Sequence, residues 1–234
     1  MQNNNETYED KKIRLAIIKF GGLSAGGTEK FLQNIAAYID KSRFEVSFFY
    51  CDSAPYIGSN FIHPDTDARQ LEWLRDSGVQ LRKFHVAAKD VRKRTHPWVG
   101  TDFWEIFDEE QFDLIQTGRA GHREFPFNRI KTVPIVDSIH LTSGVHNQKN
   151  IAVVMNLSRW SQRQWIRRGG DATKSVVISH PINDLQRKRT RTVARRQSTV
   201  VFGLHQRPDD AIFSPVPLQA FSELDPSLTR FVMM

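Results

Sequence analysis

The stretch "IRLAIIKFGGLSAGGTEKFLQNIAAYID", residues 13–40, is the segment that decides the fold. It opens with an apolar run over 13–20 that is rich in β-branched residues, which is typical of a buried strand. Two glycine pairs follow, and from Thr28 onward the apolar residues recur at helical spacing. A strand, a glycine-rich loop and an amphipathic helix in this order indicate an α/β protein that opens with a βα unit.

The rest of the chain repeats this alternation of short apolar runs and helical patterns. Further strands are predicted over 44–50, 79–84, 112–118, 132–140, 151–158 and 174–181, and further helices over 67–78, 102–110 and 159–170. Strands separated by helices favour a doubly wound parallel sheet of the Rossmann-like type. Right-handed crossovers then place the carboxyl ends of the strands along one edge, where such sheets bind ligands.

Four segments of different character divide the chain. Residues 1–12 are polar and are predicted to be a disordered tail, and residues 13–183 form the first α/β domain. Residues 184–197 are predicted to be a basic linker, and residues 198–234 begin a second α/β domain with a strand, a helix and a strand. Because three such elements cannot bury both faces of a sheet, we expect the remainder of that domain to be absent from the chain.

Composition excludes several classes of protein. No apolar run approaches the roughly 20 residues that a membrane span needs, and the N-terminus lacks the apolar segment of a signal peptide. A single cysteine, Cys51, excludes an internal disulfide framework and is expected to be a buried structural thiol in a cytoplasmic protein. No spacing of histidines or carboxylates indicates a metal site, so no metal is expected.

The glycines of the first loop point to a close ligand. Gly21, Gly22, Gly26 and Gly27 allow positive φ angles and a close approach of the backbone. Free N–H groups at the start of the following helix favour an anionic or polyhydroxylated ligand. The loop has neither the Gly-Lys-Ser/Thr of a phosphate-binding P-loop nor a G-x-G-x-x-G. A purely structural turn before a helix remains the alternative.

Several stretches, in order, resemble the glycosyltransferases of the GT-B fold, family-4 type. "GGTEKFLQNIAAYIDKSRFEVSFFY" resembles the opening loop, helix and second strand of that family. "VPIVDSIH" resembles the strand that carries an active-site histidine, and "SVVISHPI" the strand that leads toward the second domain. "VVFGLHQRPDDAIFSPVPLQAFSEL" resembles the start of the donor-binding domain. The resemblance covers about residues 13–225.

This resemblance implies a function. The protein would transfer a sugar from a nucleotide-sugar to an acceptor hydroxyl, with retention and without a metal, in the synthesis of a polysaccharide or glycoconjugate. The first domain would bind the acceptor, which is a glycan, a lipid or a protein. Gly26 and Gly27 would lie near the donor phosphate or the acceptor hydroxyls, and Gly21 and Gly22 would shape the same loop. His140 matches the family histidine that contacts the transferred sugar.

Other residues are candidates for binding substrate. His140 could hydrogen-bond a hydroxyl or support charge at the anomeric centre, or it could simply cap its strand. Asp137 could bond this histidine or end the strand. Gly118, Arg119 and His122 follow another strand and could face the same cleft, where Arg119 suits a phosphate or carboxylate. The alternative for that segment is a solvated loop. The remaining histidines, His180 among them, are expected in loops or at the surface.

The chain departs from the family pattern in its second domain. Leu204 occupies the place of the usual arginine, and Arg207 is the nearby candidate for contacting the donor phosphate. The lysine and the pair of glutamates that normally bind the donor have no counterpart. The sequence therefore also allows a noncatalytic acceptor-binding protein, or one that a partner chain completes with a donor domain.

The net charge of +7 comes mostly from "RKRTRTVARR", residues 187–196, which has six basic residues and no acidic one. Such a segment binds nucleic acid without sequence specificity, which makes a nucleic-acid-binding module a weaker alternative. It also suits anionic lipid and hence a peripheral contact with a membrane. A dehydrogenase is weaker still, because G-x-G-x-x-G is missing and Asp52 is the nearest acid after the second strand.

Overall fold

The computed structural model describes residues 11–19, 23, 26–51, 68–85, 101–119, 129–140, 144–145, 148–180, 200–204 and 216–233. The chain divides into two compact units, Met1–Pro181 and Ile182–Met234. Each unit is described by itself below.

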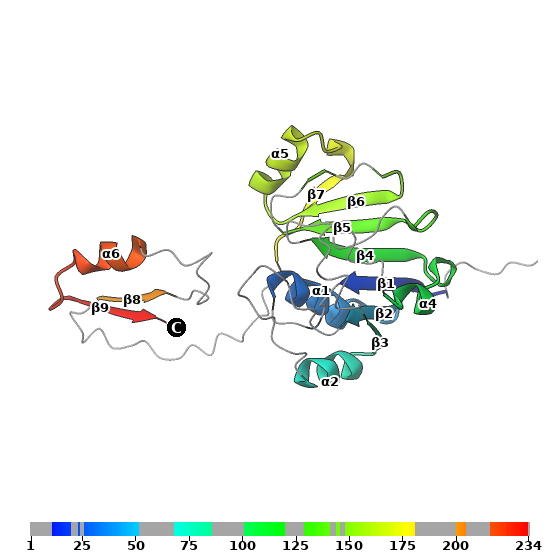
Figure 1. Ribbon diagram of the computed structural model, residues 1–234, viewed down its shortest axis with the longest axis horizontal. Helices are drawn as coiled ribbons and strands as arrows, with labels where there is room; N and C mark the ends of the chain where they lie inside the picture. The colour runs from blue at the N-terminus through cyan, green and yellow to red at the C-terminus, as the bar shows by residue number, and fades with distance from the viewer. Residues whose placement is uncertain are drawn as a thin grey trace, which may run out of the picture. The chain divides into compact units, whose positions relative to one another are not determined.

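Unit 1 is built on a seven-stranded sheet in which every pair of neighbours is parallel (Figure 1). The strand order is β3-β2-β1-β4-β5-β6-β7. Its strands are β1 (Ile13–Lys19), β2 (Phe44–Cys51), β3 (Val79–Phe84), β4 (Leu114–Arg119), β5 (Ile135–Ile139), β6 (Ile151–Asn156) and β7 (Ser175–Val177). The predicted doubly wound parallel sheet is therefore confirmed.

The strand order reverses next to β1, which is an inner strand of the sheet. β1 pairs on one side with β2, where Ile13 faces Phe44, and on the other side with β4, where Leu15 faces Leu114. Sheets of this type bind ligands at the carboxyl ends of the strands at such a switch point. The topology therefore directs attention to the ends of β1 and β4.

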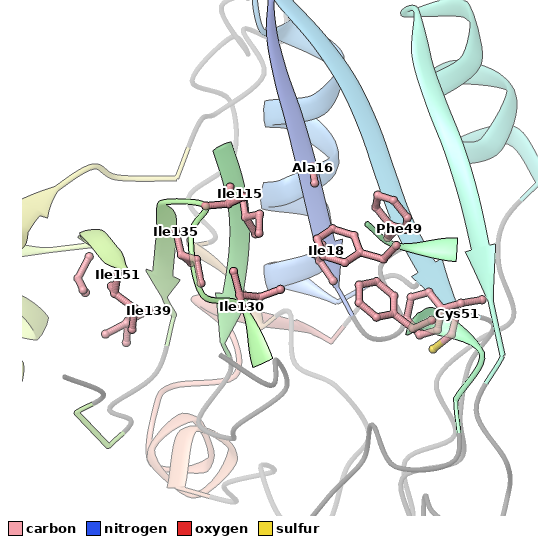
Figure 2. Packing of buried hydrophobic residues seen from close by; sticks show 14 of the residues in the cluster. Ala16, Ile18, Phe49, Cys51, Ile115, Ile130, Ile135, Ile139 and Ile151 are labelled. Carbon is pink, nitrogen blue, oxygen red and sulfur yellow. The ribbon is translucent and has the colours of Figure 1, made fainter. Parts of the chain in front are cut away.

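The inner strands β1 and β2 are buried on both faces of the sheet, which explains their long apolar runs, whereas the edge strands β3 and β7 are largely exposed. Ala16 and Ile18 of β1 lie in one core with apolar residues of the neighbouring strands, including Cys51, which is buried as predicted (Figure 2). Leu15 and Ile17 point to the opposite core. The α1 helix (Gly27–Tyr38) and α2 (Ala68–Asp76) pack in this second core, whereas α4 (Phe103–Ile106) and α5 (Arg159–Arg167) pack in the first.

The helix expected over 102–110 is wrong in length. It is interrupted after α4, because Phe107 takes an extended backbone and its ring stacks on Phe103 and Phe112 in the core. Asp108 then accepts a hydrogen bond from the Glu110 N–H and starts a separate 3₁₀ turn, Glu109–Gln111. Packing of one aromatic ring thus overrides local helix propensity.

α5 begins as the sequence predicts. Ser158 and Ser161 form a reciprocal capping box at its N-terminus. The chain leaves the helix through Gly169, whose φ of 93° is in the left-handed region that favours glycine. A 3₁₀ turn over Ala172–Lys174 then leads into β7.

Unit 2 contains a strand, a helix and a strand, as predicted. β8 (Val200–Leu204) and β9 (Thr229–Met233) pair in parallel, with Val200 facing Thr229, and α6 (Val216–Ser222) connects them. Within the described ranges of both units, no helix has the length and apolar character needed to cross a membrane.

Candidate functional site

Three strand ends and one helix start meet at the switch point of unit 1. β1 ends at Lys19, β4 ends at Arg119, and His140 directly follows β5. α1 starts at Gly27 and supplies Glu29 and Phe31 to the same place. The predicted site residues Gly118 and His140 are brought together here, together with two charged residues that the sequence did not single out.

Lys19 and Glu29 form a buried ion pair. The Lys19 Nζ lies 3.1 Å from a Glu29 carboxylate oxygen, and the side chains are 1% and 9% exposed. Burial lowers the pKa of Lys19, and the adjacent Glu29 carboxylate opposes this shift. The pair ties the end of β1 to the first turn of α1, and its two charges offset each other.

Gly26 is required by this ion pair and not by its own backbone angles. It precedes α1 with a φ of −69°, so it does not use the positive φ angles that a glycine allows. Among the described glycines, only Gly78 and Gly169 have a positive φ. A Cβ on Gly26 would collide with the Glu29 carboxylate, which is folded back over it. A Cβ on Gly27 would meet open space, so this packing does not require a glycine there.

The first turn of α1 therefore already holds an anion. A carboxylate at a helix N-terminus interacts favourably with the helix dipole, as a bound phosphate would. Of the two ligands that the sequence left open near Gly26, the position of Glu29 favours a hydroxyl over a phosphate, because the Glu29 carboxylate already occupies the place of an anion and Lys19 is already paired with it.

Gly118 lets β4 lie close to α1 and His140. A Cβ at this position would come within 2.9 Å of Thr28 Cγ2 and 3.6 Å of His140 Nε2. The first distance is shorter than side chains tolerate, so a larger residue would displace the start of α1. The next residue, Arg119, pairs with Ile139 at the end of the sheet.

His140 is the only predicted catalytic residue, and the structure gives it a clear chemical state. Both ring nitrogens are buried, and neither has a hydrogen-bond partner among the residues that the structure describes. Burial, together with the charges of His180 and Lys19, lowers the pKa of His140 to about 3. The imidazole is therefore neutral near pH 7, with one nitrogen able to donate and the other able to accept a hydrogen bond.

Asp137 does not bond to this histidine, because neither nitrogen of His140 has a partner within the described ranges, to which Asp137 belongs. It is fully buried inside β5, between Thr117 of β4 and Val154 of β6. Strand alternation places it on the same face as Ile135 and Ile139, which belong to the core opposite α1. His140, in contrast, contacts Phe31 of α1.

His180 is a residue of this site that sequence reasoning missed. His180 is exposed to solvent, but the centroid of its ring lies 4.9 Å from that of His140 and 5.2 Å from that of Phe31. The sequence predicted a loop or surface role. The one available signal was that His180 follows the last strand of the sheet, whose end lies on the same edge as the end of β5.

The other predicted residues, Gly21, Gly22, His122 and Arg207, lie outside the described residues, as does the predicted linker 184–197. In the part of the chain that the structure describes, no group of three or more histidine, cysteine, aspartate or glutamate side chains could hold a metal ion.

Comparison with known proteins gives matches of structure only. No protein-family model matches the sequence, and no curated protein matches it. HepE of Anabaena in complex with UDP superposes with a TM-score of 0.54 and 15% identity, and its complex with UDP-glucose superposes with 0.52 and 16%. The lipopolysaccharide outer core galactosyltransferase WaaB, in its apo form, superposes with 0.55 and 12%. An O-GlcNAc transferase mutant of Thermobaculum terrenum superposes with 0.52 and 15%.

The shares of the chains that match are unequal. The matches to HepE and WaaB cover 94% of this chain but 60% of those proteins, and the match to the O-GlcNAc transferase covers 96% of this chain but 39% of that one. At these identities the likeness concerns the fold. The chain has the Rossmann-like α/β architecture of GT-B glycosyltransferases.

Proposed function

We propose that the chain acts in glycosyl transfer, moving a sugar from a nucleotide-sugar to an acceptor hydroxyl with retention of configuration and without a metal. The observation that carries this proposal is a neutral imidazole, His140, at the switch point of the sheet, whose two ring nitrogens have no hydrogen-bond partner among the described residues. Such a group is suited to a ligand that both donates and accepts hydrogen bonds, and a hydroxyl does both.

The charge of the site supports a hydroxyl as the ligand of unit 1. Lys19 is paired with Glu29, and His140 is neutral, so the described side chains here offer no net cation to a phosphate. His140 is accordingly proposed to orient a hydroxyl by hydrogen bonding rather than to stabilise charge at the anomeric centre. Gly118 and the adjoining segment with Arg119 and His122 would line the acceptor.

The donor is proposed to be a nucleotide-sugar that unit 2 helps to bind. HepE, which shares the fold, is described in complexes with UDP and with UDP-glucose. Arg207 is the proposed phosphate contact. The family-4 assignment, a cytoplasmic location, a peripheral membrane contact and a glycan, lipid or protein acceptor are parts of the same proposal. They rest on the sequence resemblance.

Calorimetric titration of the 234-residue chain with UDP, UDP-glucose and uncharged methyl glycosides tests this function, together with an assay of sugar release from UDP-glucose. We expect saturable binding that His140→Gln weakens. The matched control is His85→Gln, because His85 follows β3 at the same edge, four strands from β5 and hence about 19 Å away. No binding of any of these ligands would contradict the proposal. Binding of a glycoside without sugar release would favour the noncatalytic acceptor-binding alternative.

A further inference from the structure

Three rings from distant parts of the sequence form a compact cluster at this site. Phe31 comes from α1, His140 follows β5, and His180 follows β7. The centroid distances are 4.8 Å for Phe31–His140, 5.2 Å for Phe31–His180 and 4.9 Å for His140–His180, and all three contacts are edge-to-face. Each ring therefore touches both of the others, and none can rotate without disturbing the cluster.

The chain after β7 is anchored in a way that places His180 on His140. β7 lies two strands from β5, which is a distance of about 10 Å, and three extended residues span about the same length. On this path the Ile178 N–H donates to the Asn156 carbonyl at 2.9 Å, and the Ser179 hydroxyl donates to the Leu157 carbonyl at 3.4 Å. The first of these bonds continues the parallel pairing of β6 with β7, in which Asn156 faces Val177, so the segment that carries His180 is held beside the end of β6.

The two imidazoles differ in their access to water. The nitrogens of His140 are buried, whereas His180 is an exposed residue. Two positive charges at this separation repel strongly, so the pair takes up one proton before the other. The first proton binds to His180, because the exposed imidazole is the easier of the two to charge. Within the described ranges, Lys19 is the other charged group that acts on His140, and like His180 it opposes a positive charge there.

We propose that His180 is a positioning residue for His140: it fixes the imidazole against Phe31, and its own positive charge adds to the burial that keeps His140 neutral. The site thereby keeps its hydrogen-bond acceptor to a lower pH than burial alone would give. The link to sugar transfer rests on the proposed function, but the arrangement of the rings and protons does not.

The test is NMR titration of the His140 ring in the full chain, with tautomer and midpoint read from ¹⁵N-edited spectra. In His180→Ala, we expect the midpoint of His140 to rise from about 3 by roughly one unit, because a neighbouring positive charge is lost. We also expect exchange broadening of the ring signals. In His180→Phe, which keeps a ring in place, we expect the same rise without the broadening.

His85→Ala is the matched control and should leave the His140 signals unchanged. An unchanged midpoint and unchanged line shapes of His140 in both His180 variants would overturn the proposal. Where His180→Ala does not fold, His180→Phe alone still decides the question of charge. If the chain binds no nucleotide-sugar or glycoside but the midpoint moves, the proposed function fails and the role of His180 stands. If it binds them and the midpoint does not move, the reverse holds.

Discussion

The two ends of β1 each carry one ion pair, and the two pairs differ in almost every respect. At the amino end, Arg14 donates to Asp113 through its backbone N–H and two guanidinium nitrogens at 2.8–3.1 Å. Both side chains of this pair are more than a third exposed. At the carboxyl end, Lys19 and Glu29 make one contact in a buried place. The exposed pair makes more hydrogen bonds, but the buried pair is expected to matter more for the stability of unit 1.

The difference shows that the stability of this sheet depends more on the ion pair at its carboxyl edge than on the pair at its amino edge. An exposed pair is screened by water and adds little to stability, whereas a buried charge depends on its partner. The amino edge of the sheet can therefore lose a charge at low cost. The carboxyl edge, where the proposed site lies, cannot. All five tryptophans lie in residues 1–181, so tryptophan fluorescence reports the unfolding of unit 1 alone and can measure this difference.

Removal of one partner of the buried pair should have the largest effect. Lys19→Met leaves the Glu29 carboxylate buried without its cation, and we expect unit 1 to lose about 3–5 kcal/mol of unfolding free energy. Urea denaturation followed by tryptophan fluorescence measures this loss. The double variant Lys19→Met/Glu29→Gln should recover much of it, because no uncompensated charge remains. A loss that Glu29→Gln does not reduce would show that Lys19 acts through packing instead.

The neutral state of His140 predicts a loss of stability in acid. Because the folded pKa of about 3 lies below the ordinary 6.5, the unfolded chain binds a proton that the folded chain does not. Stability is full above pH 6.5 and falls as the pH drops toward 3, by at most roughly 5 kcal/mol. Urea denaturation at pH values between about 7.5 and 4.5 measures the slope. His140→Gln should flatten it.

Gly26 and Gly27 are adjacent, but only the first should be sensitive to substitution. Gly26→Ala places a methyl group against the Glu29 carboxylate, which Lys19 holds in place, and we expect a loss of about 1–3 kcal/mol. Gly27→Ala meets open space and should be close to neutral. The two variants are compared by thermal unfolding. Equal losses would contradict the packing argument at Gly26.

The exposed pair should have the smallest effect. Arg14→Ala is expected to lower the melting temperature only slightly, and NaCl at about 1 M should reduce even that difference. The Arg14 guanidinium lowers the pKa of Asp113 to about 2, so the contribution of this pair is present above pH 3.8 and is lost as the pH falls toward 2. An effect of Arg14→Ala as large as that of Lys19→Met would remove the contrast between the two ends of β1.

Much of the fold follows from the sequence because the inner strands of unit 1 are buried on both faces. An apolar run such as the one that contains Leu15, Ala16, Ile17 and Ile18 has no polar face, which distinguishes it from the periodic helix that follows. The prediction of one helix over 102–110 was wrong because tertiary contacts interrupt that segment. Its local pattern is helical, but the contacts of Phe107 with Phe103 and Phe112 are tertiary, and periodicity does not report tertiary contacts.

The site could be predicted only in part. His140 is predicted from the resemblance of "VPIVDSIH" to the family strand that carries an active-site histidine, and Gly118 from its place at a strand end, because strand ends of a parallel sheet share one edge. Lys19 lies inside the predicted strand 13–20, and nothing in its neighbours says that its ammonium group is buried. A single lysine within an apolar run, followed ten residues later by Glu29 in the first turn of a helix, was the available signal. His180 reaches the site only through the hydrogen bonds of Ile178 and Ser179 to the end of β6.

The position of β1 inside the sheet has a consequence for folding during translation. β2 follows β1 closely along the chain and pairs with one edge of β1. The other edge of β1 pairs with β4, which is made much later, since Arg14 and Asp113 are 99 residues apart. At ordinary rates of translation, that interval lasts roughly 5–20 s. During this time β1, an apolar inner strand of the sheet, has one unpaired edge while the chain is still attached to the ribosome. We expect this nascent segment to be the part of unit 1 that most needs a chaperone.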